Sequence, residues 1–363
     1  MIPLSAEAHA ALTGSHKRYV RASSRLGDEL LAESVPIDSG DEECDRSLSV
    51  PERVTLTVPA RHRGTSWSPT TDDHPLAAKG QRLLIEVGIG SDSGEIEWFN
   101  RGEFVIFETT TDGDAVTVEC RGLLHLIEEA RLITPFQPSG TIISTLRALV
   151  EPALTVDVTG APADWSVPAG INYDEDRLAA VRELLDAWPA DAYVTEDGVL
   201  AVVPAEQSMT PVLSITDGAG GTIERVVGTD TRDGAFSVVV ARGTAADGGQ
   251  VQGVAEAPPG SPYALGGNFN ALPVPFFFPS PLLTTNAQCT AAARTVRDRK
   301  LRQRALSFTV QMVPHPGLQI RDVVSLTTDE HTDLLCTVEA LRLPYREDGG
   351  LQELTARSLS WTG

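Results

Sequence analysis

The residues of this chain that could carry chemistry are mostly carboxylates, and some lie beside a histidine. In the segment His125-Leu-Ile-Glu128-Glu129, the imidazole and a carboxylate are one helical turn apart, a spacing that could give two metal ligands. A catalytic zinc needs three protein ligands, and no second histidine lies nearby in the sequence. The spacing therefore favours a surface pair, and no metal site is predicted.

Acidic runs offer two further kinds of site. Asp112-Gly-Asp114 and the stretch around Asp41, Glu42 and Glu43 could bind calcium, but neither has the alternating oxygen ligands and closing bidentate glutamate of a calcium loop. We expect solvated turns at both. The 50 Asp and Glu residues also offer many pairs for glycoside hydrolysis, and only three-dimensional separation distinguishes a catalytic pair. A cell-wall or glycan hydrolase on a β scaffold therefore stays open as an alternative without named residues.

A glycine-rich segment invites a nucleotide-loop interpretation. Gly88-Ile-Gly90-Ser-Asp-Ser-Gly94 has the spacing G-x-G-x-x-x-G, and a strand pattern follows where a phosphate-binding helix would begin. An aspartate stands at its centre where a nucleophile elbow needs serine, and there is no Walker-type lysine loop. The histidines have no Ser or Cys partner at a diagnostic spacing, although a triad need not be local in sequence. We predict a hairpin turn here, and no catalytic or cofactor-binding residues in the chain.

Composition limits the partners and the compartment. Lys and Arg total 29 against 50 Asp and Glu, and the net charge of −21 repels nucleic acid and anionic membranes. The four cysteines form no C-x-x-C pair, which predicts buried or free thiols. The N-terminus lacks a basic region followed by an apolar core, and no apolar stretch approaches the roughly 18 residues that span a bilayer. We therefore expect no membrane span, and a chain made in a cytoplasm.

Two features stand apart from the acidic background. Residues 257–282 hold seven prolines and three consecutive phenylalanines, too broken for a regular element and too apolar for a disordered linker. Cations crowd the end of the next predicted helix, where the helix dipole favours them and a neighbouring subunit could supply acidic partners. Both features predict a protein interface, with nucleic-acid contact at the cations as the weaker alternative. The predicted interface residues are Phe276, Phe277, Phe278, Arg294, Arg297 and Arg302.

A carbohydrate-binding function would need an exposed aromatic face. Trp67 or Trp98 could supply one by stacking on a sugar. Single tryptophans in strands are more often part of the core, so this function ranks below the others.

The elements that must position these residues are mainly strands in the first third of the chain. Alternating patterns bounded by turn residues predict strands there. Residues 31–50 carry six acidic residues against Arg46 alone, which predicts a solvated, extended loop. The sequence Asn100-Arg-Gly predicts a turn between two strands. The predicted strands cover residues 16–25, 30–35, 53–58, 83–89, 95–99, 104–109 and 115–120.

Helical patterns mark the middle of the chain. They cover residues 123–132 and 141–149, and a third helix is capped by Asp174 and stopped by Pro189. A buried stripe runs along this third helix at Leu178, Val181, Leu184, Leu185 and Trp188. Short strands at 193–194 and 199–203 pair around a Glu-Asp-Gly turn.

Strand patterns return in the last third, around one helix from Thr284 or Thr285 to about Arg304. At about 150 residues per domain, 363 residues predict two or three domains. The fold class is α+β and mainly β, with a β domain at 1–134, a small α+β domain at 135–210 and a second β domain at 211–363. The strands of the last third cover 222–227, 235–242, 250–255, 306–312, 323–327, 335–343 and 351–359.

Several stretches together resemble the tail-tip hub family, that is, minor tail or baseplate hub proteins of actinobacterial siphophages. The resemblance covers about half of the chain, and its motifs are turns and strand starts without catalytic residues. They are Gly80–Val87, Glu97–Ile106, Leu184–Val203, Gly-Val-Ala-Glu-Ala at 253–257, Ser-Pro-Tyr at 261–263, Gly-Gly-Asn-Phe at 266–269, Pro-Phe-Phe-Phe at 275–278, Ala-Ala-Arg at 292–294, Val313–Leu318 and Asp322–Val324.

The resemblance implies a non-enzymatic hub without cofactors. Such hubs are typically trimers in which each chain gives two tail-tube-like β-barrel or sandwich domains, so that a sixfold tube becomes a threefold tip. The implied partners are copies of the chain, the tail tube, and the distal tail and tip or spike proteins, with DNA crossing the channel unbound. The implied location is the virion, after assembly in the host cytoplasm.

Overall fold

The computed structural model describes residues 1–12, 14, 16–90, 94–206, 208–302, 306–346 and 350–359, with the side chain of Arg302 excepted. Strands make up 42% of the chain and helices 14%, which confirms the predicted α+β, mainly β fold. None of the helices in these residues is long and apolar enough to cross a bilayer.

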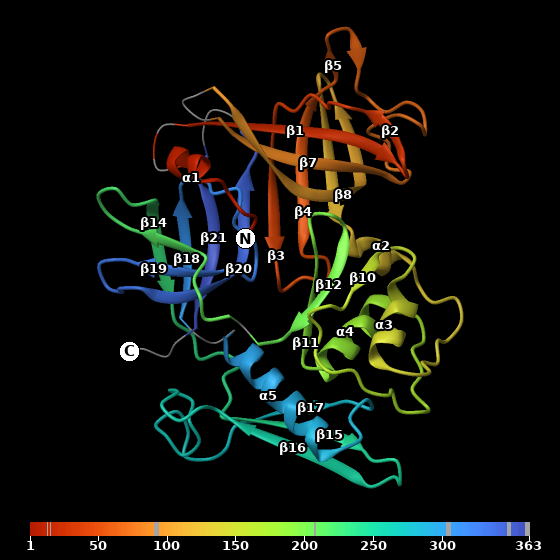
Figure 1. Ribbon diagram of the computed structural model, residues 1–363, viewed down its shortest axis with the longest axis vertical. Helices are drawn as coiled ribbons and strands as arrows, with labels where there is room; N and C mark the ends of the chain where they lie inside the picture. The colour runs from red at the N-terminus through yellow and green to blue at the C-terminus, as the bar shows by residue number, and fades with distance from the viewer. Residues whose placement is uncertain are drawn as a thin grey trace.

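A 13-stranded sheet runs through the molecule and contains strands from both ends of the chain (Figure 1). Its hydrogen-bonded order is β14-β18-β21-β20-β3-β4-β9-β8-β7-β1-β2, and β19, which carries β13 on its other side, also pairs with β20. The N-terminal strands are β1 (Lys17–Leu26), β2 (Glu29–Ala32), β3 (Ser39–Asp45), β4 (Glu52–Pro59), β7 (Gln81–Gly90), β8 (Ile96–Asp112) and β9 (Ala115–Gly122). The C-terminal strands are β13 (Leu213–Thr216), β14 (Ile223–Thr229), β18 (Ser307–Met312), β19 (Val323–Thr327), β20 (Leu334–Pro344) and β21 (Gln352–Ser358).

Strand β3 corrects the prediction of a solvated acidic loop. It pairs with β4 on one side and with β20 on the other, from Asp41 opposite Pro344 to Asp45 opposite Ala340. Its side chains alternate, so that Glu42 and Cys44 point into the core while Glu43 points to solvent. The acidic run is therefore the strand that joins the two ends of the chain into one sheet.

Strand β8 corrects the prediction of a turn at Asn100-Arg-Gly. One continuous strand runs through that sequence, and its register against β7 shifts between Ile85 and Glu86. Gly102 has a positive φ of 123° and donates its N–H to the side-chain oxygen of Asn100 over 2.9 Å. The turn residues thus make a β-bulge, which bends the strand without ending it.

A small α+β unit follows the N-terminal strands. The third helix is the one predicted from the buried stripe, but its N-cap is Asp176, which accepts from Ala179 N–H over 2.9 Å, and not Asp174. The unit consists of α2 (Leu124–Glu129), α3 (Ile142–Val150), α4 (Arg177–Ala187) and the sheet β10 (Thr155–Asp157), β12 (Val199–Pro204) and β11 (Ala190–Val194).

A second small unit interrupts the C-terminal strands. Its sheet has the order β16 (Gln250–Glu256), β15 (Val238–Thr244) and β17 (Pro275–Pro279), and it packs on α5 (Asn286–Arg302). The phenylalanines predicted to lie in an irregular loop form β17, which runs parallel to β15. The remaining elements are α1 (Ala6–Leu12), β5 (Arg61–His62) and β6 (Thr65–Ser66).

The two largest hydrophobic cores match this arrangement. One lies within the large sheet and includes Leu56 and Leu83 from the first half of the chain with Val310 and Leu354 from the second. The other lies beneath the helices and both small sheets, around the fully buried Trp188. Division into domains at 1–134, 135–210 and 211–363 stays a prediction.

Candidate functional site

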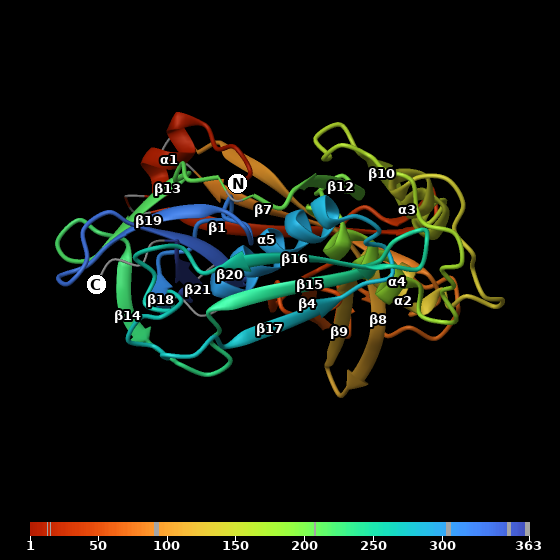
Figure 2. The ribbon, with the colours of Figure 1, turned by 90° about the horizontal axis from the view of Figure 1, so that it is seen from below.

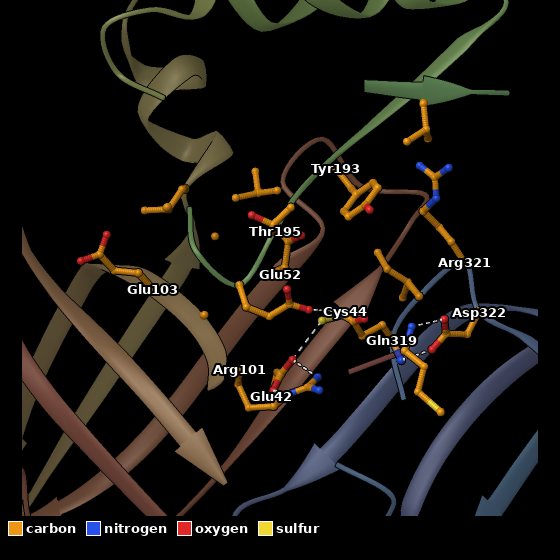
Figure 3. A pocket seen from close by; sticks show the side chains of 18 of the residues that line it. Glu42, Cys44, Glu52, Arg101, Glu103, Tyr193, Thr195, Gln319, Arg321 and Asp322 are labelled. Carbon is orange, nitrogen blue, oxygen red and sulfur yellow. Dashed lines mark hydrogen bonds and ion pairs between the residues drawn. The ribbon is translucent and has the colours of Figure 1, made fainter. Parts of the chain in front are cut away.

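A hollow of about 600 Å³ lies where the N-terminal strands, the turn between β11 and β12 and residues 319–322 meet (Figure 3). Six acidic residues line it, and Arg101 and Arg321 also border it. The residues come from distant parts of the sequence because β3 places the two halves of the sheet side by side. The acids are Glu42, Glu52, Glu103, Glu196, Glu206 and Asp322.

The inner wall of this hollow is a buried ion pair between Glu42 and Arg101. Arg101 donates from Nε to Oε2 over 2.9 Å and from Nη2 to Oε1 over 2.6 Å. Tyr345 donates its hydroxyl to Oε2 over 2.6 Å, and Cys44 donates from Sγ to Oε1 over 3.4 Å. Burial acts to raise the pKa of Glu42, but the charge and hydrogen bonds of Arg101 outweigh it, so the pKa lies below its ordinary value.

Glu52, at the start of β4, lines the same hollow but differs from Glu42 in its hydrogen bonding and in the direction of its pKa shift. Its Oε2 is buried without a hydrogen-bond partner. Burial raises the pKa of Glu52 to about 7, against a lowering backbone hydrogen bond and with a smaller contribution from Glu42. Glu52 therefore exchanges its proton near neutral pH, whereas Glu42 stays ionised.

The arrangement of Glu42 and Glu52 favours a structural use of this pair over hydrolysis. Acid–base catalysis on a glycoside needs a second carboxylate that is free to act as base or nucleophile. The neighbouring Glu42 is already bound by Arg101 and Tyr345, deep in the interior. Among the described residues, no group of three or more His, Cys, Asp or Glu side chains is arranged to hold a metal ion.

A second hollow, of about 890 Å³, lies between the large sheet and the two small units, around Asp191. Arg46 donates to Asp191 over 2.5 Å, and the Nη1 of Arg321 lies 3.1 Å from the same oxygen. Burial acts to raise the pKa of Asp191, but Arg321, Arg46 and Arg299 together hold it below its ordinary value. One carboxylate thus links the β3–β4 turn, β11 and the segment before β19.

The predicted interface residues are divided by the structure. Phe276 and Phe278 face inward and pack against the core of the small units, while Phe277 faces outward and is 50% exposed. Arg294 is exposed, and Arg297 is held by Asp298 and by the carbonyl of Glu256. The side chain of Arg302 lies outside the described residues. Their role as an interface stays a prediction.

Two neighbouring cations of α5 make contacts within the chain. Arg299 pairs with Asp186 of α4, and Lys300 lies 4.9 Å from the ring centroid of Phe276. The basic end of this helix therefore fastens α5 to the small α+β unit. The sequence shows the cluster of cations but not this partner, because Asp186 is more than a hundred residues away.

The remaining sequence candidates are ordinary structural features. His125 lies 3.0 Å from Glu128 and 3.2 Å from Glu129, but its imidazole is buried, so the predicted surface pair is only partly at the surface. Asp112 and Asp114 flank the exposed tip of the β8–β9 hairpin.

The tryptophans considered for sugar stacking are covered, and the glycine-rich segment is only partly described. Trp67 is buried, and Trp98 is partly covered by the guanidinium of Arg21 at 4.1 Å, so neither offers a free stacking face. Residues 91–93, at the centre of the glycine-rich segment, lie outside the described part.

Solved structures of phage tail proteins share this fold. The tail protein from Neisseria meningitidis MC58 has a TM-score of 0.64 and 15% identity, covering 94% of this chain and 97% of that one. The 43 kDa tail protein of prophage MuSo2 from Shewanella oneidensis has a TM-score of 0.61 and 11% identity, covering 93% and 98%. A component of the type VI secretion system of E. coli has a TM-score of 0.52 and 11% identity, covering 90% and 74%. No model of a protein family matches the sequence, and no curated protein is significantly similar to it.

Proposed function

We propose that the chain is a structural hub of a phage tail tip or baseplate, which forms an oligomer around the channel that DNA crosses. The observation that carries the proposal is the shared fold with the N. meningitidis tail protein over 94% of this chain and 97% of that one. The E. coli secretion-system component, described as similar in structure to the bacteriophage T4 tail proteins gp27 and gp5, supports the same role.

The fold gives this role a physical basis. Because β3 pairs with β20, the N-terminal and C-terminal strands form one hydrogen-bonded sheet within each chain. Three such chains would place six β units around an axis, which fits the change from a sixfold tube to a threefold tip. The proposed partners are two further copies, the tail tube, and the distal tail and tip or spike proteins of the virion, assembled in the host cytoplasm.

The charge of the chain fits a channel that DNA crosses without binding. A net charge of −21 per chain repels phosphate and favours sliding over retention. No enzymatic step and no cofactor belong to this proposal.

The mass and symmetry of the purified protein test it directly. Light scattering with negative-stain imaging should show a ring-shaped trimer with a central hole, alone or with the tail-tube protein added. A monomer under both conditions, together with turnover of peptidoglycan or glycan, would favour the hydrolase instead.

A further inference from the structure

The three-stranded sheet β16-β15-β17 has one covered face and one open face. Its inner face packs on α5, where Val239 and Ala241 are fully buried. Gly253 is part of this face, and a Cβ there would come within 2.2 Å of the backbone nitrogen of Thr290. The helix and the sheet therefore lie in direct backbone contact, and the unit has two layers only (Figure 2).

The outer face carries an apolar row across all three strands. Val240 lies directly opposite Val254 of β16 and directly opposite Phe277 of β17, so the three side chains share a face. Val254 is 45% exposed and Phe277 is 50% exposed. The guanidinium of Arg242 lies 4.7 Å from the ring centroid of Phe277, at one end of this row.

The β17 edge of this sheet is less suited to a partner than its face. Edge strand β17 begins with Pro275 and ends with Pro279, and proline has no N–H to donate to an added strand. Extension of the sheet beside β17 is therefore disfavoured.

Charges on either side of the row are arranged in a self-complementary way. Arg242 lies two residues beyond Val240 on one side, and Glu256 lies opposite Val238, two residues beyond on the other side. Both charged side chains are exposed, whereas Val238 is buried within the chain. A half-turn about an axis along the row would exchange these two sides.

We propose that this face binds the same face of a second copy of the chain about a two-fold axis along the row. Val254, Val240 and Phe277 of each chain would then pack on their counterparts, at the roughly 10 Å spacing of stacked sheets. Arg242 of each chain would lie over the cross-strand pair of Val238 and Glu256 in the other chain, giving two ion pairs. The contact is isologous, so it pairs two chains and cannot close a ring of three.

This inference goes beyond the proposed hub and does not depend on it. A three-fold ring needs two different surfaces on each chain, whereas this contact uses one surface twice. The mass distinguishes the two assemblies. A pair of chains has twice the chain mass of 38.7 kDa, and a ring of three chains has three times that mass. A pair of rings joined through this face would have six times that mass.

Substitutions in the row test the contact. Phe277→Asp and Val254→Asp each place a charge in the apolar row and should weaken self-association by about 30-fold or more, as expected for central contacts. Leu30→Asp is the matched control, because Leu30 is 52% exposed on β2, far along the other sheet. Far-UV circular dichroism of each variant checks that the fold is retained.

Charge reversal tests the orientation. Arg242→Glu and Glu256→Arg should each weaken the pair, because like charges then meet, and the double variant should restore it. Sedimentation equilibrium over a concentration series measures the mass. A wild-type protein that shows no even-numbered assembly up to its solubility limit would overturn the inference, as would even-numbered assemblies that both row variants leave unchanged.

Discussion

Arg101 of β8 and Glu42 of β3 form a two-point ion pair inside the large sheet, with side chains only 3% and 2% exposed. Arg101 also donates to the carbonyl of Leu318 over 3.4 Å, so the pair contacts a segment that leads into the C-terminal strands. Removing one partner of a buried ion pair destabilises a protein far more than removing both, because the remaining charge is left buried without its partner.

Removal of Arg101 should therefore be severe. Arg101→Met leaves the Glu42 carboxylate buried without its counter-charge, and we expect a loss of about 3–5 kcal/mol in the free energy of unfolding. Urea denaturation followed by circular dichroism measures it. Arg342→Met is the control, because Arg342 of β20 pairs with Asp41 of β3 at the surface and its loss should cost at most about 1 kcal/mol.

The double variant Glu42→Gln with Arg101→Met separates charge from shape. It should recover part of the loss, because no uncompensated charge remains buried. A double variant as unstable as the sum of its single variants would show that packing, and not the ion pair, is what Arg101 contributes.

Glu52 should make the chain less stable as the pH rises. Its pKa is about 7 in the folded chain against 4.5 in the unfolded chain, so the folded state binds more protons between these values. Stability then falls as the pH rises from 4.5 through about 7. Glu52→Gln should remove this fall and stabilise the chain above pH 7 by up to about 3 kcal/mol. Equal pH profiles for the variant and the wild type would contradict the assignment, and Glu43→Gln, exposed on β3, is the control.

Asp191 should give the opposite pH dependence: its contribution to stability is lost as the solution becomes more acidic. Its folded pKa lies below the ordinary 3.8, so its contribution is fully present above that value and is lost as the pH falls through the folded pKa. Asp191→Asn should cost about 3 kcal/mol at pH 7, because three guanidinium groups lose their shared carboxylate. The variant should also show a shallower acid transition than the wild type in unfolding experiments between pH 2 and 5. An unchanged acid transition would show that Asp191 does not carry this contribution.

Gly253 of the small sheet should not tolerate a side chain. A methyl group there meets the backbone of α5 at 2.2–2.3 Å, and backbone cannot move aside as a side chain can. Gly253→Ala should cost about 1–3 kcal/mol or more in thermal unfolding. Gly228→Ala, a strand glycine whose Cβ would meet only the Phe308 ring at 3.6 Å, should change stability little. Similar melting temperatures for the two variants would rule out this close approach.

Local patterns in the sequence were enough to predict most of the strands and helix α4. The alternation of Val54, Leu56 and Val58 predicts β4 because one face of that strand is buried. Helix α4 follows from an apolar stripe with 3.6-residue spacing and an acidic N-cap, although the cap, Asp176, is two residues later than expected. In both cases neighbouring residues contain the information that decides the structure.

Strand β3 and the candidate site depend on information that is not local. The sequence Asp41-Glu-Glu-Cys-Asp is typical of a solvated segment. It becomes a strand because Arg101, 59 residues from Glu42, neutralises the inward carboxylate, and Tyr345, 303 residues away, donates a hydrogen bond to it. Likewise, Phe276 to Phe278 form a strand because β15 lies beside them in the fold. A single sequence gives no sign of either pairing.

The pairing of β3 with β20 also sets an order of events during synthesis. Asp41 to Asp45 leave the ribosome almost 300 residues before Ala340 to Pro344, their neighbours in the sheet. Until then, one edge of β3 has unpaired backbone groups, and closing such a long loop is slow. The nascent chain therefore carries an open sheet edge through most of translation, and only the emergence of β20 supplies the strand that closes it.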